Sequence, residues 1–182
     1  DLDVELRADD ALVTAKLAIR RQAPGPLLLD GEELELQSVR LDGTPLKSDA
    51  YSLTDESISI AEVPDAFVLE TVTRIVPQKN TKLEGLYATK HGFVTQCEAQ
   101  GFRRITWFID RPDVLARYTT TVRADRKKYP VLLSNGNLVA SGEEADGRHW
   151  ARLHGNTRTE GWPFSASCRT TSRSARMTQL RA

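Results

Sequence analysis

The chain has 182 residues, enough for one domain of ordinary size, and 40% of them are hydrophobic, enough to bury a core. Its formal net charge is zero, which argues against a nucleic-acid-binding protein because phosphate recognition relies on clustered Lys and Arg. No apolar run approaches the roughly 20 residues needed to cross a bilayer, so we expect no membrane segment. The first six residues are acidic rather than signal-like, and the two cysteines form no paired motif, so we expect a cytoplasmic protein.

Charge and composition change near residue 153. Residues 1–152 contain 24 acidic and 20 basic residues, whereas residues 153–182 contain one acid, Glu160, and five arginines. Nine of those last 30 residues are Ser or Thr, and they show no apolar period of 2 or 3.6. We therefore divide the chain into a folded domain, residues 1–152, and an irregular tail, residues 153–182, which we expect to be disordered or out of frame.

Short segments with strand character follow one another through the first half of the chain. Leu2, Val4 and Leu6 alternate with acids, the pattern of a strand with one buried and one wet face. A second strand is predicted over residues 12–19, before a turn at Pro24-Gly25-Pro26. β-Branched and aromatic residues predict further strands between turn residues: 34–41 between Asp30-Gly31 and Asp42-Gly43, then 51–53, 57–60 and 67–75.

The clearest local signal is Asn135-Gly136, which joins two apolar runs, residues 131–133 and 138–140. This arrangement predicts a β-hairpin closed by a two-residue turn. Only residues 111–116 resemble a helical turn, since Pro112 suits a first turn and Asp113 suits the positive end of a helix dipole. Many short strands with almost no helix predict an all-β fold, a β-sandwich.

Several groups of residues in the middle of the chain resemble one family. They are Leu83-Glu84-Gly85-Leu86-Tyr87, Thr95 through Arg104 with Gln96-Cys97-Glu98 within it, Trp107 through Asp113, and residues 128–130 and 133–137. In this order they resemble the N-terminal domain of the aminopeptidase N (alanyl aminopeptidase) branch of the gluzincin zinc peptidases. The likeness stops abruptly after Arg152. We interpret the break as a reading-frame change, which makes the chain a truncated, frameshifted form of such a domain.

The resemblance implies a saddle-like β-sandwich that packs, in the complete enzyme, against a thermolysin-like domain of the same polypeptide. That domain would hold zinc and remove amino-terminal residues from peptides with metal-activated water. The resemblance also implies that the Gln-Cys-Glu strip borders the free amino end of the substrate. Glu98 would then bind the ammonium group, and Gln96 would shape the pocket for the first side chain.

The residues themselves are compatible with those two roles. Gln96 and Glu98 are two apart in a region of strand character, so their side chains should point to the same face of a sheet. A carboxylate can bind an ammonium group by a charge-assisted hydrogen bond. Without the resemblance, two solvent-facing polar residues would be the simpler interpretation.

No catalytic or metal site can be proposed from this sequence alone. None of the three histidines, His91, His149 and His154, belongs to a His-Glu-x-x-His pair, so we expect no zinc bound by this chain. Cys97 has no local base that would activate it and is expected to be a small buried residue.

The remaining charged residues of the motifs are expected to be structural. Arg103 and Arg104 can hold acidic partners, and the turn from Asp110 to Asp113 can be fixed by charged hydrogen bonds. We therefore expect a fragment without peptidase activity that contributes recognition of the substrate's amino terminus. The alternative is a stand-alone β-sandwich that acts in binding or as a scaffold. The Gln96-x-Glu98 spacing speaks against a scaffold, which needs no ammonium anchor.

Overall fold

The computed structural model describes residues 1–156 and 166–169, and in this part nearly all regular structure is β-strand. One sheet carries eight of the described strands, in the order β13-β14-β11-β1-β2-β8-β4-β5. Neighbours in it are antiparallel apart from β1 and β11, which run parallel. Its members are β1 (Leu2–Leu6), β2 (Ala11–Arg20), β4 (Glu35–Leu41), β5 (Thr44–Pro45), β8 (Ala66–Ile75), β11 (Arg117–Asp125), β13 (Asn137–Glu143) and β14 (Arg148–Asn156).

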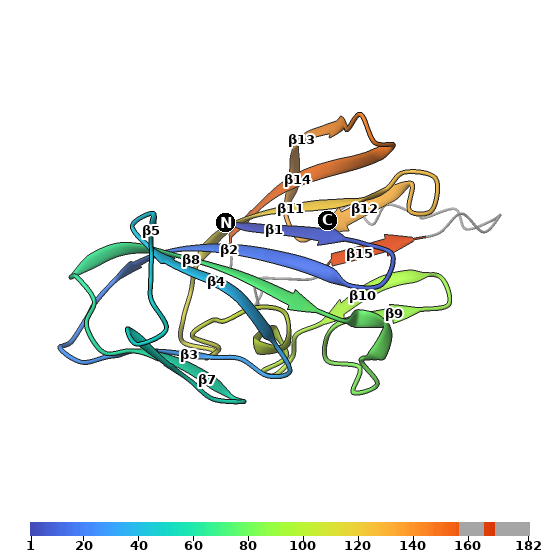
Figure 1. Cartoon of the computed structure of the whole chain (residues 1–182). Coiled ribbons are helices and arrows are strands. Elements are labelled where there is room, and N and C mark those ends of the chain that lie inside the picture. The colour runs from blue at the N-terminus through green and yellow to red at the C-terminus, as the bar shows by residue number, and fades with distance from the viewer. Residues whose placement is uncertain (157–165, 170–182) are drawn as a thin grey trace.

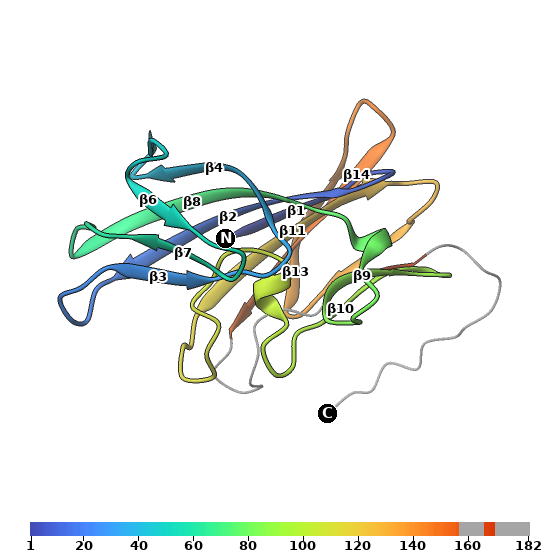
Figure 2. The ribbon, with the colours of Figure 1, turned by 60° about the horizontal axis from the view of Figure 1, so that its bottom comes forward.

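Two smaller sheets lie beneath the large one in the view of Figure 1, and Figure 2 shows them side by side. One has the order β12-β15-β10-β9 and the other β3-β7-β6. Their strands are β9 (Gly85–Thr89), β10 (Gly92–Gln96), β12 (Val131–Ser134) and β15 (Ala166–Arg169), then β3 (Leu27–Asp30), β6 (Tyr51–Leu53) and β7 (Ser57–Ile60). The described residues also form two short 3₁₀ helices, η1 (Pro77–Lys79) and η2 (Phe102–Arg104). The predicted all-β fold is confirmed.

Alternating side chains explain why both small sheets pack on the same face of the large sheet. In β8, Phe67 and Leu69 are buried at one end and Ile75 is buried at the other, and all three stand on one face because they are an even number of residues apart. Phe67 and Leu69 join the core over the sheet β3-β7-β6, whereas Ile75 joins the core over the sheet β12-β15-β10-β9. The large sheet therefore covers two hydrophobic cores, one against each small sheet.

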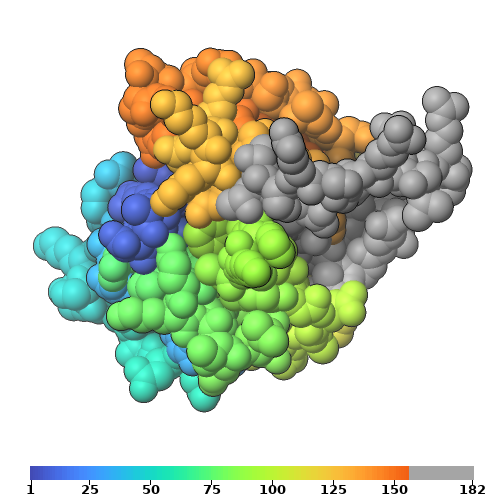
Figure 3. Space-filling view, turned by 90° about the vertical axis from the view of Figure 1, so that its right-hand side faces the viewer, coloured from blue at the N-terminus to red at the C-terminus, as the bar shows by residue number. Residues whose placement is uncertain are grey.

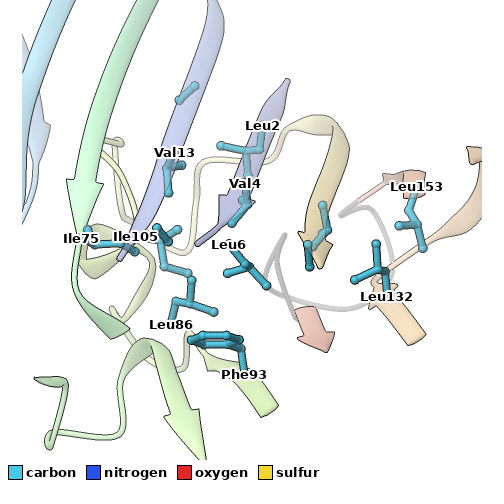
Figure 4. Close-up of a cluster of buried hydrophobic side chains, with 14 of the residues drawn as sticks. Leu2, Val4, Leu6, Val13, Ile75, Leu86, Phe93, Ile105, Leu132 and Leu153 are labelled. Carbon is cyan, nitrogen blue, oxygen red and sulfur yellow. The ribbon is translucent and has the colours of Figure 1, made fainter. Parts of the chain in front are cut away.

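The core beneath β1 and β11 is the larger of the two. Leu2, Val4 and Leu6 of β1 enter it from the large sheet, and Phe93 of β10 enters it from below (Figure 4). The second core is built around Trp107, which is 1% exposed and packs among the aliphatic residues of β3 and β7. Burial of these side chains is the main favourable term for both contacts between layers.

Most of the predicted strands are present at or close to the predicted positions. The segments at 51–53 and 57–60 are β6 and β7 without any shift, and the segments at 12–19, 34–41 and 67–75 lie in β2, β4 and β8. The expected turn between β4 and β5 contains Asp42 and Gly43, whose φ angles are +48° and +80°.

The predicted hairpin at Asn135-Gly136 is wrong. Strand β12 before it pairs with β15 in a small sheet, and strand β13 after it pairs with β14 in the large sheet. Gly136 has a φ of +98°, and a Cβ built on it would lie 2.2 Å from the carbonyl oxygen of His154. The Asn-Gly pair therefore carries the chain from one layer to another, and its glycine is needed because the chain crosses close to β14.

The predicted helical turn at residues 111–116 is also wrong. Pro112 and Asp113 form a single turn, closed by a hydrogen bond of 3.2 Å from the Val114 N–H to the Arg111 carbonyl oxygen. The chain then runs without regular structure into β11 at Arg117. Proline at this position suits a β-turn as well as a helix start, so the local signal does not separate the two.

In the predicted tail, the described residues form strand structure. Strand β14 continues past Arg152 to Asn156, and Ala166–Arg169 form β15, which lies between β10 and β12. The expectation of a wholly irregular tail is therefore not met at these positions. The rest of that prediction falls on residues 157–165 and 170–182, which lie outside the described residues.

The face of the large sheet turned away from both cores carries a continuous chain of ion pairs. Asp3 and Glu5 stand on this face because they alternate with the buried leucines and valine of β1. Arg123 binds Asp3 at 2.9 Å and also binds Glu144. The complete ion-pair chain alternates in charge across six strands and their loops and runs in the order Asp3, Arg123, Glu144, Arg148, Glu5, Arg7, Asp10, Arg74 and Glu35.

Candidate functional site

The two predicted site residues lie at the end of β10 and just beyond it. Figure 3 shows in green the surface of the segment that contains β9 and β10. Gln96 is the last residue of the strand and pairs with Gly85 of β9, whereas Glu98 is already in a turn. Both side chains are exposed, and Cys97 between them is 5% exposed. Glu98 thus lies outside the strand, although the exposed, buried, exposed pattern of residues 96–98 continues the alternation past the end of β10.

The turn from Cys97 to Gly101, which we call the Glu98 turn, is short and closed. The Gly101 N–H donates to the Cys97 carbonyl oxygen at 2.9 Å, and the Glu98–Ala99 peptide bond is cis. A Cβ on Gly101 would lie 2.5 Å from the Gln96 carbonyl oxygen. Only glycine fits at this point, because the chain folds back onto its own backbone.

Two of the motifs that are separate in the sequence meet at this turn. Gly85 has a φ of +70°, and a Cβ on it would lie 2.6 Å from the Cβ of Arg104 and 3.1 Å from the Gly101 carbonyl oxygen. The Glu84-Gly85 corner therefore packs directly on the turn and on η2. This contact explains why both motifs contain a glycine.

The inner side of the turn is held by hydrophobic contacts. Cys97, Phe102 and Ile105 all belong to the larger core, and the rings of Phe102 and Phe108 meet edge to face at 4.9 Å. Burial raises the pKa of the Cys97 thiol to about 12, and the carboxylates of Asp110 and Glu98 contribute to the rise. Cys97 is the small buried residue that the sequence predicts.

Arg103 fastens the end of the turn to a buried carboxylate. Its backbone N–H and its Nε each donate to Asp110 Oδ2 at 3.1 Å, and its Nη2 donates to the Asp110 carbonyl oxygen at 3.1 Å. Asp110 is fully buried, and its own N–H donates to Asp30 Oδ2 at 3.1 Å. Burial raises the pKa of Asp110 although the hydrogen bonds from Arg103 oppose the rise.

Arg104 is surrounded by three carboxylates. Its side chain is 8% exposed and makes ion pairs with Glu32, with Glu33 at 3.2 Å and with Glu84 at 3.3 Å. Burial alone would raise the pKa of Glu33, but hydrogen bonds from Lys82 and Arg104 outweigh it and hold that pKa below its ordinary value. A hollow of about 230 Å³ lies beside Arg104 and Leu86.

These contacts agree with the structural roles expected for Arg103, Arg104 and the following turn. In that turn Arg111 and Asp113 pair at 3.0 Å, while Asp110 faces inward to Arg103. Sequence reasoning missed the acidic partners, which are Asp30, Glu32, Glu33 and Glu84. No local signal marks them, because Glu32 precedes Arg104 by 72 positions and Asp30 precedes Asp110 by 80.

The histidines do not converge on the site or on one another. His149 Nε2 lies 2.7 Å from the Tyr129 carbonyl oxygen, and His154 Nδ1 lies 3.1 Å from Thr119 Oγ1. The two are five residues apart on β14 and therefore point to opposite faces. Within residues 1–156 and 166–169, no three His, Cys, Asp or Glu side chains are grouped so that they could hold a metal ion.

Other openings of the surface lie away from Gln96 and Glu98. A groove of about 560 Å³ runs over the outer face of the large sheet, between Thr14, Lys16, Thr121 and Arg152. Neither of the predicted site residues lines it. Gln96 and Glu98 are both exposed, so the turn forms part of the outer surface of the domain.

Comparison with known proteins identifies the family to which this domain belongs. Residues 1–158 match the family model of the peptidase M1 N-terminal domain. The chain belongs to this family. The match extends past Arg152, where the sequence analysis places the end of the domain, and takes in the rest of β14.

Two curated M1 relatives are similar over most of the chain. Aminopeptidase N of Caulobacter vibrioides is 52% identical over 141 residues, which are 76% of this chain and 16% of that protein. Aminopeptidase N of Escherichia coli is 47% identical over 154 residues, which are 84% of this chain and 18% of that protein. The chain therefore spans less than a fifth of the length of these relatives.

Solved M1 structures share the fold. Aminopeptidase A of Legionella pneumophila, solved in complex with aspartic acid, has a TM-score of 0.86 and 32% identity, covering 95% of this chain and 21% of that one. The M1 zinc metallopeptidase of Deinococcus radiodurans, solved as a mutant bound to a Tyr-Ser-Ala substrate, has a TM-score of 0.76. At 14% identity the second comparison concerns the fold alone. No helix of the described residues is long and apolar enough to span a membrane.

Proposed function

We propose that this chain serves as the N-terminal domain of a zinc-dependent aminopeptidase and recognises the amino terminus of the peptide substrate. The observation that carries the proposal is the state of Glu98. Its carboxylate is exposed on a closed turn, and no described residue engages it in a hydrogen bond or an ion pair. The acids around Arg104, by contrast, are all used in ion pairs.

Glu98 has the chemistry that an unblocked peptide requires. The ammonium group at the end of a peptide is a compact cation with three N–H donors, and a free carboxylate binds it by charge-assisted hydrogen bonds. A carboxylate held on a fixed turn loses little side-chain and backbone freedom when the ligand binds. Gln96, exposed at the end of β10, is proposed to line the pocket for the first side chain.

Zinc has no place on this chain in the proposal. The histidines lie apart, and the described residues contain no group of metal ligands, so they do not fit a zinc site. The metal and the hydrolytic step are assigned to a catalytic domain of the same polypeptide, and the present chain is proposed to have no peptidase activity alone. A cytoplasmic location is part of the same proposal.

A chimera tests the role of Glu98. Residues 1–156 would replace the matching segment of Escherichia coli aminopeptidase N, and kcat/KM would be measured with an unblocked alanyl peptide. Glu98→Ala should lower kcat/KM, mainly through a higher KM. The fall should correspond to a loss of about 1.5–3 kcal/mol of binding free energy, the usual contribution of a hydrogen bond to a charged group. Glu62→Ala is the matched control, because Glu62 is also exposed and has no ion pair among the described residues. Equal kinetics for the two variants would remove Glu98 from the site.

A further inference from the structure

The Glu98 turn has few internal contacts that fix its position. Its internal backbone hydrogen bond joins Gly101 to Cys97, and Gly101, the N-cap residue of η2, makes no side-chain capping bond. The first N–H groups of a helical turn need acceptors from elsewhere. Asp110 Oδ2 supplies one, because it accepts from the Arg103 N–H at 3.1 Å. A buried side chain seven residues downstream thus acts where a capping residue would normally act.

We propose that Asp110 is a positioning residue for the Glu98 turn, acting through Arg103. Three hydrogen bonds join the two residues, and they fix both the backbone and the guanidinium of Arg103. Arg103 is separated from the end of the turn by Phe102 alone. The effect of Asp110 on ligand binding rests on the proposed function of Glu98, whereas its effect on the turn does not.

Asp110 is itself held by the neighbouring sheet. Its N–H donates to Asp30 Oδ2 at 3.1 Å, and Asp30 is the last residue of β3. The backbone of Asp30 exchanges hydrogen bonds of 2.8 and 3.1 Å with Phe108. A second bond, from the Glu32 N–H to the Arg103 carbonyl oxygen at 2.9 Å, joins the same two segments. The Glu98 turn, which follows a strand of one small sheet, is therefore fixed to the other small sheet.

The arrangement has a cost that points to positioning. Asp110 is fully buried, and its Oδ1 has no hydrogen-bond partner among the described residues. An unsatisfied buried carboxylate oxygen lowers stability, and the bonds to Arg103 offset this cost. A carboxylate has the advantage that one oxygen can hold both donors of Arg103 with charge-assisted bonds.

The first test measures the turn in the 182-residue chain without any ligand. Steady-state ¹H–¹⁵N NOE values of Glu98 and Gln100 would be compared between the unmodified chain, Asp110→Ala and the control Asp113→Ala, which removes an exposed carboxylate of the adjacent turn. We expect the NOE values to fall in Asp110→Ala alone and to be restored in large part by Asp110→Asn, which keeps an acceptor for the Arg103 N–H. If Asp110→Ala does not fold, Arg103→Ala takes its place. This variant keeps the backbone bond from residue 103 to Asp110 Oδ2 but loses the guanidinium bonds, so the NOE values of Glu98 and Gln100 should still fall. Unchanged values in the folded variants would overturn the proposal.

The second test measures binding of an unblocked alanine tripeptide amide, with its N-acetyl form as the reference probe. Asp110→Ala should weaken binding of the unblocked peptide from a few-fold to about tenfold, and this effect should vanish in a Glu98→Gln background, because coupled residues are not additive. If Glu98→Gln alone leaves binding unchanged, the proposed function fails while the NOE values still decide the positioning role. If Glu98→Gln weakens binding and Asp110→Ala does not, the positioning proposal fails while the proposed function stands.

Discussion

Cys97 illustrates how the site combines an exposed rim with a buried support. It lies between the exposed Gln96 and Glu98 but belongs to the larger core. The residue is 5% exposed, and burial is the main cause of the high pKa of its thiol. The thiolate is the reactive form of cysteine, so low exposure and protonation both protect the Cys97 thiol from reaction.

We predict that Cys97 does not react with iodoacetamide in the folded chain at pH 8. A rise of the pKa from 9.0 to about 12 lowers the thiolate fraction about a thousandfold. Alkylation followed by mass spectrometry in a Cys168→Ser variant should therefore be at least about a hundredfold slower than in the same variant unfolded in urea. Rates within tenfold of each other would show that the turn opens readily.

The candidate residues were predictable from the sequence, but their supports were not. Gln96 and Glu98 follow from the resemblance to the family, whose motif is contiguous. Three of the acidic partners of Arg103 and Arg104, which are Asp30, Glu32 and Glu33, come from the far end of β3 and the loop after it, so these contacts depend on how the sheets pack. A local pattern contains no information about such a pair.

At the scale of elements, a strong contrast between its two faces makes a strand such as β1 predictable from the sequence. In β1 the buried leucines and valine alternate with acids, and the strand is where the pattern places it. In β11 the inward side chains include Thr120, Val122 and Ala124, which are small or polar, so the alternation is weak. The sequence pattern therefore predicts no strand over residues 117–125.

The hairpin predicted at Asn135-Gly136 is wrong because the sequence signal there is local. Turn chemistry reports the local backbone, whereas the sheet that each strand joins is decided by its neighbours in space. Gly136→Ala should be destabilising on two grounds, the positive φ and the overlap with the His154 carbonyl oxygen. Gly147→Ala is the matched control, because Gly147 has a φ of +85° but nothing within 4 Å of its Cβ position.

We expect Gly147→Ala to cost about 1–2 kcal/mol of unfolding free energy, the usual penalty of a left-handed backbone. Gly136→Ala should cost roughly 1–3 kcal/mol more, because a crowded neighbour must also move. Urea unfolding of the two variants under the same conditions gives the difference. If both variants lose the same unfolding free energy, the chain near Gly136 adjusts to the added methyl group without cost.

At the scale of the whole molecule, the ion-pair chain on the outer face neutralises the charges of strands that are far apart in the sequence. One of its members, Arg123, is 27% exposed and binds Asp3 with both Nε and Nη2. Arg126 makes a single pair with Glu143, and both side chains are more than half exposed. Paired geometry and partial burial favour the first interaction, whereas exposed pairs contribute little.

We predict that Arg123→Met lowers the unfolding free energy by about 1.5–3 kcal/mol, whereas Arg126→Met changes it by less than about 0.5 kcal/mol. The difference should narrow between 0.05 and 1 M NaCl, where the screening length falls to about 3 Å. Urea titrations at the two salt concentrations measure both effects. A difference that does not depend on salt would assign the stability to packing of the arginine stem.

The parallel pairing of β1 with β11 also affects the order in which strands can pair while the chain is being synthesised. Leu2 pairs with Thr120, so the partner of the first strand is made only after more than a hundred further residues have left the ribosome. Until then β1 can pair with β2 on one side, while its other edge stays open in the middle of the future sheet. Contacts between distant parts of a chain form slowly, and an unpaired strand edge invites pairing with other chains. The central seam of the domain therefore stays open until β11 has been made, and during that time the free edge of β1 is exposed to pairing with other chains.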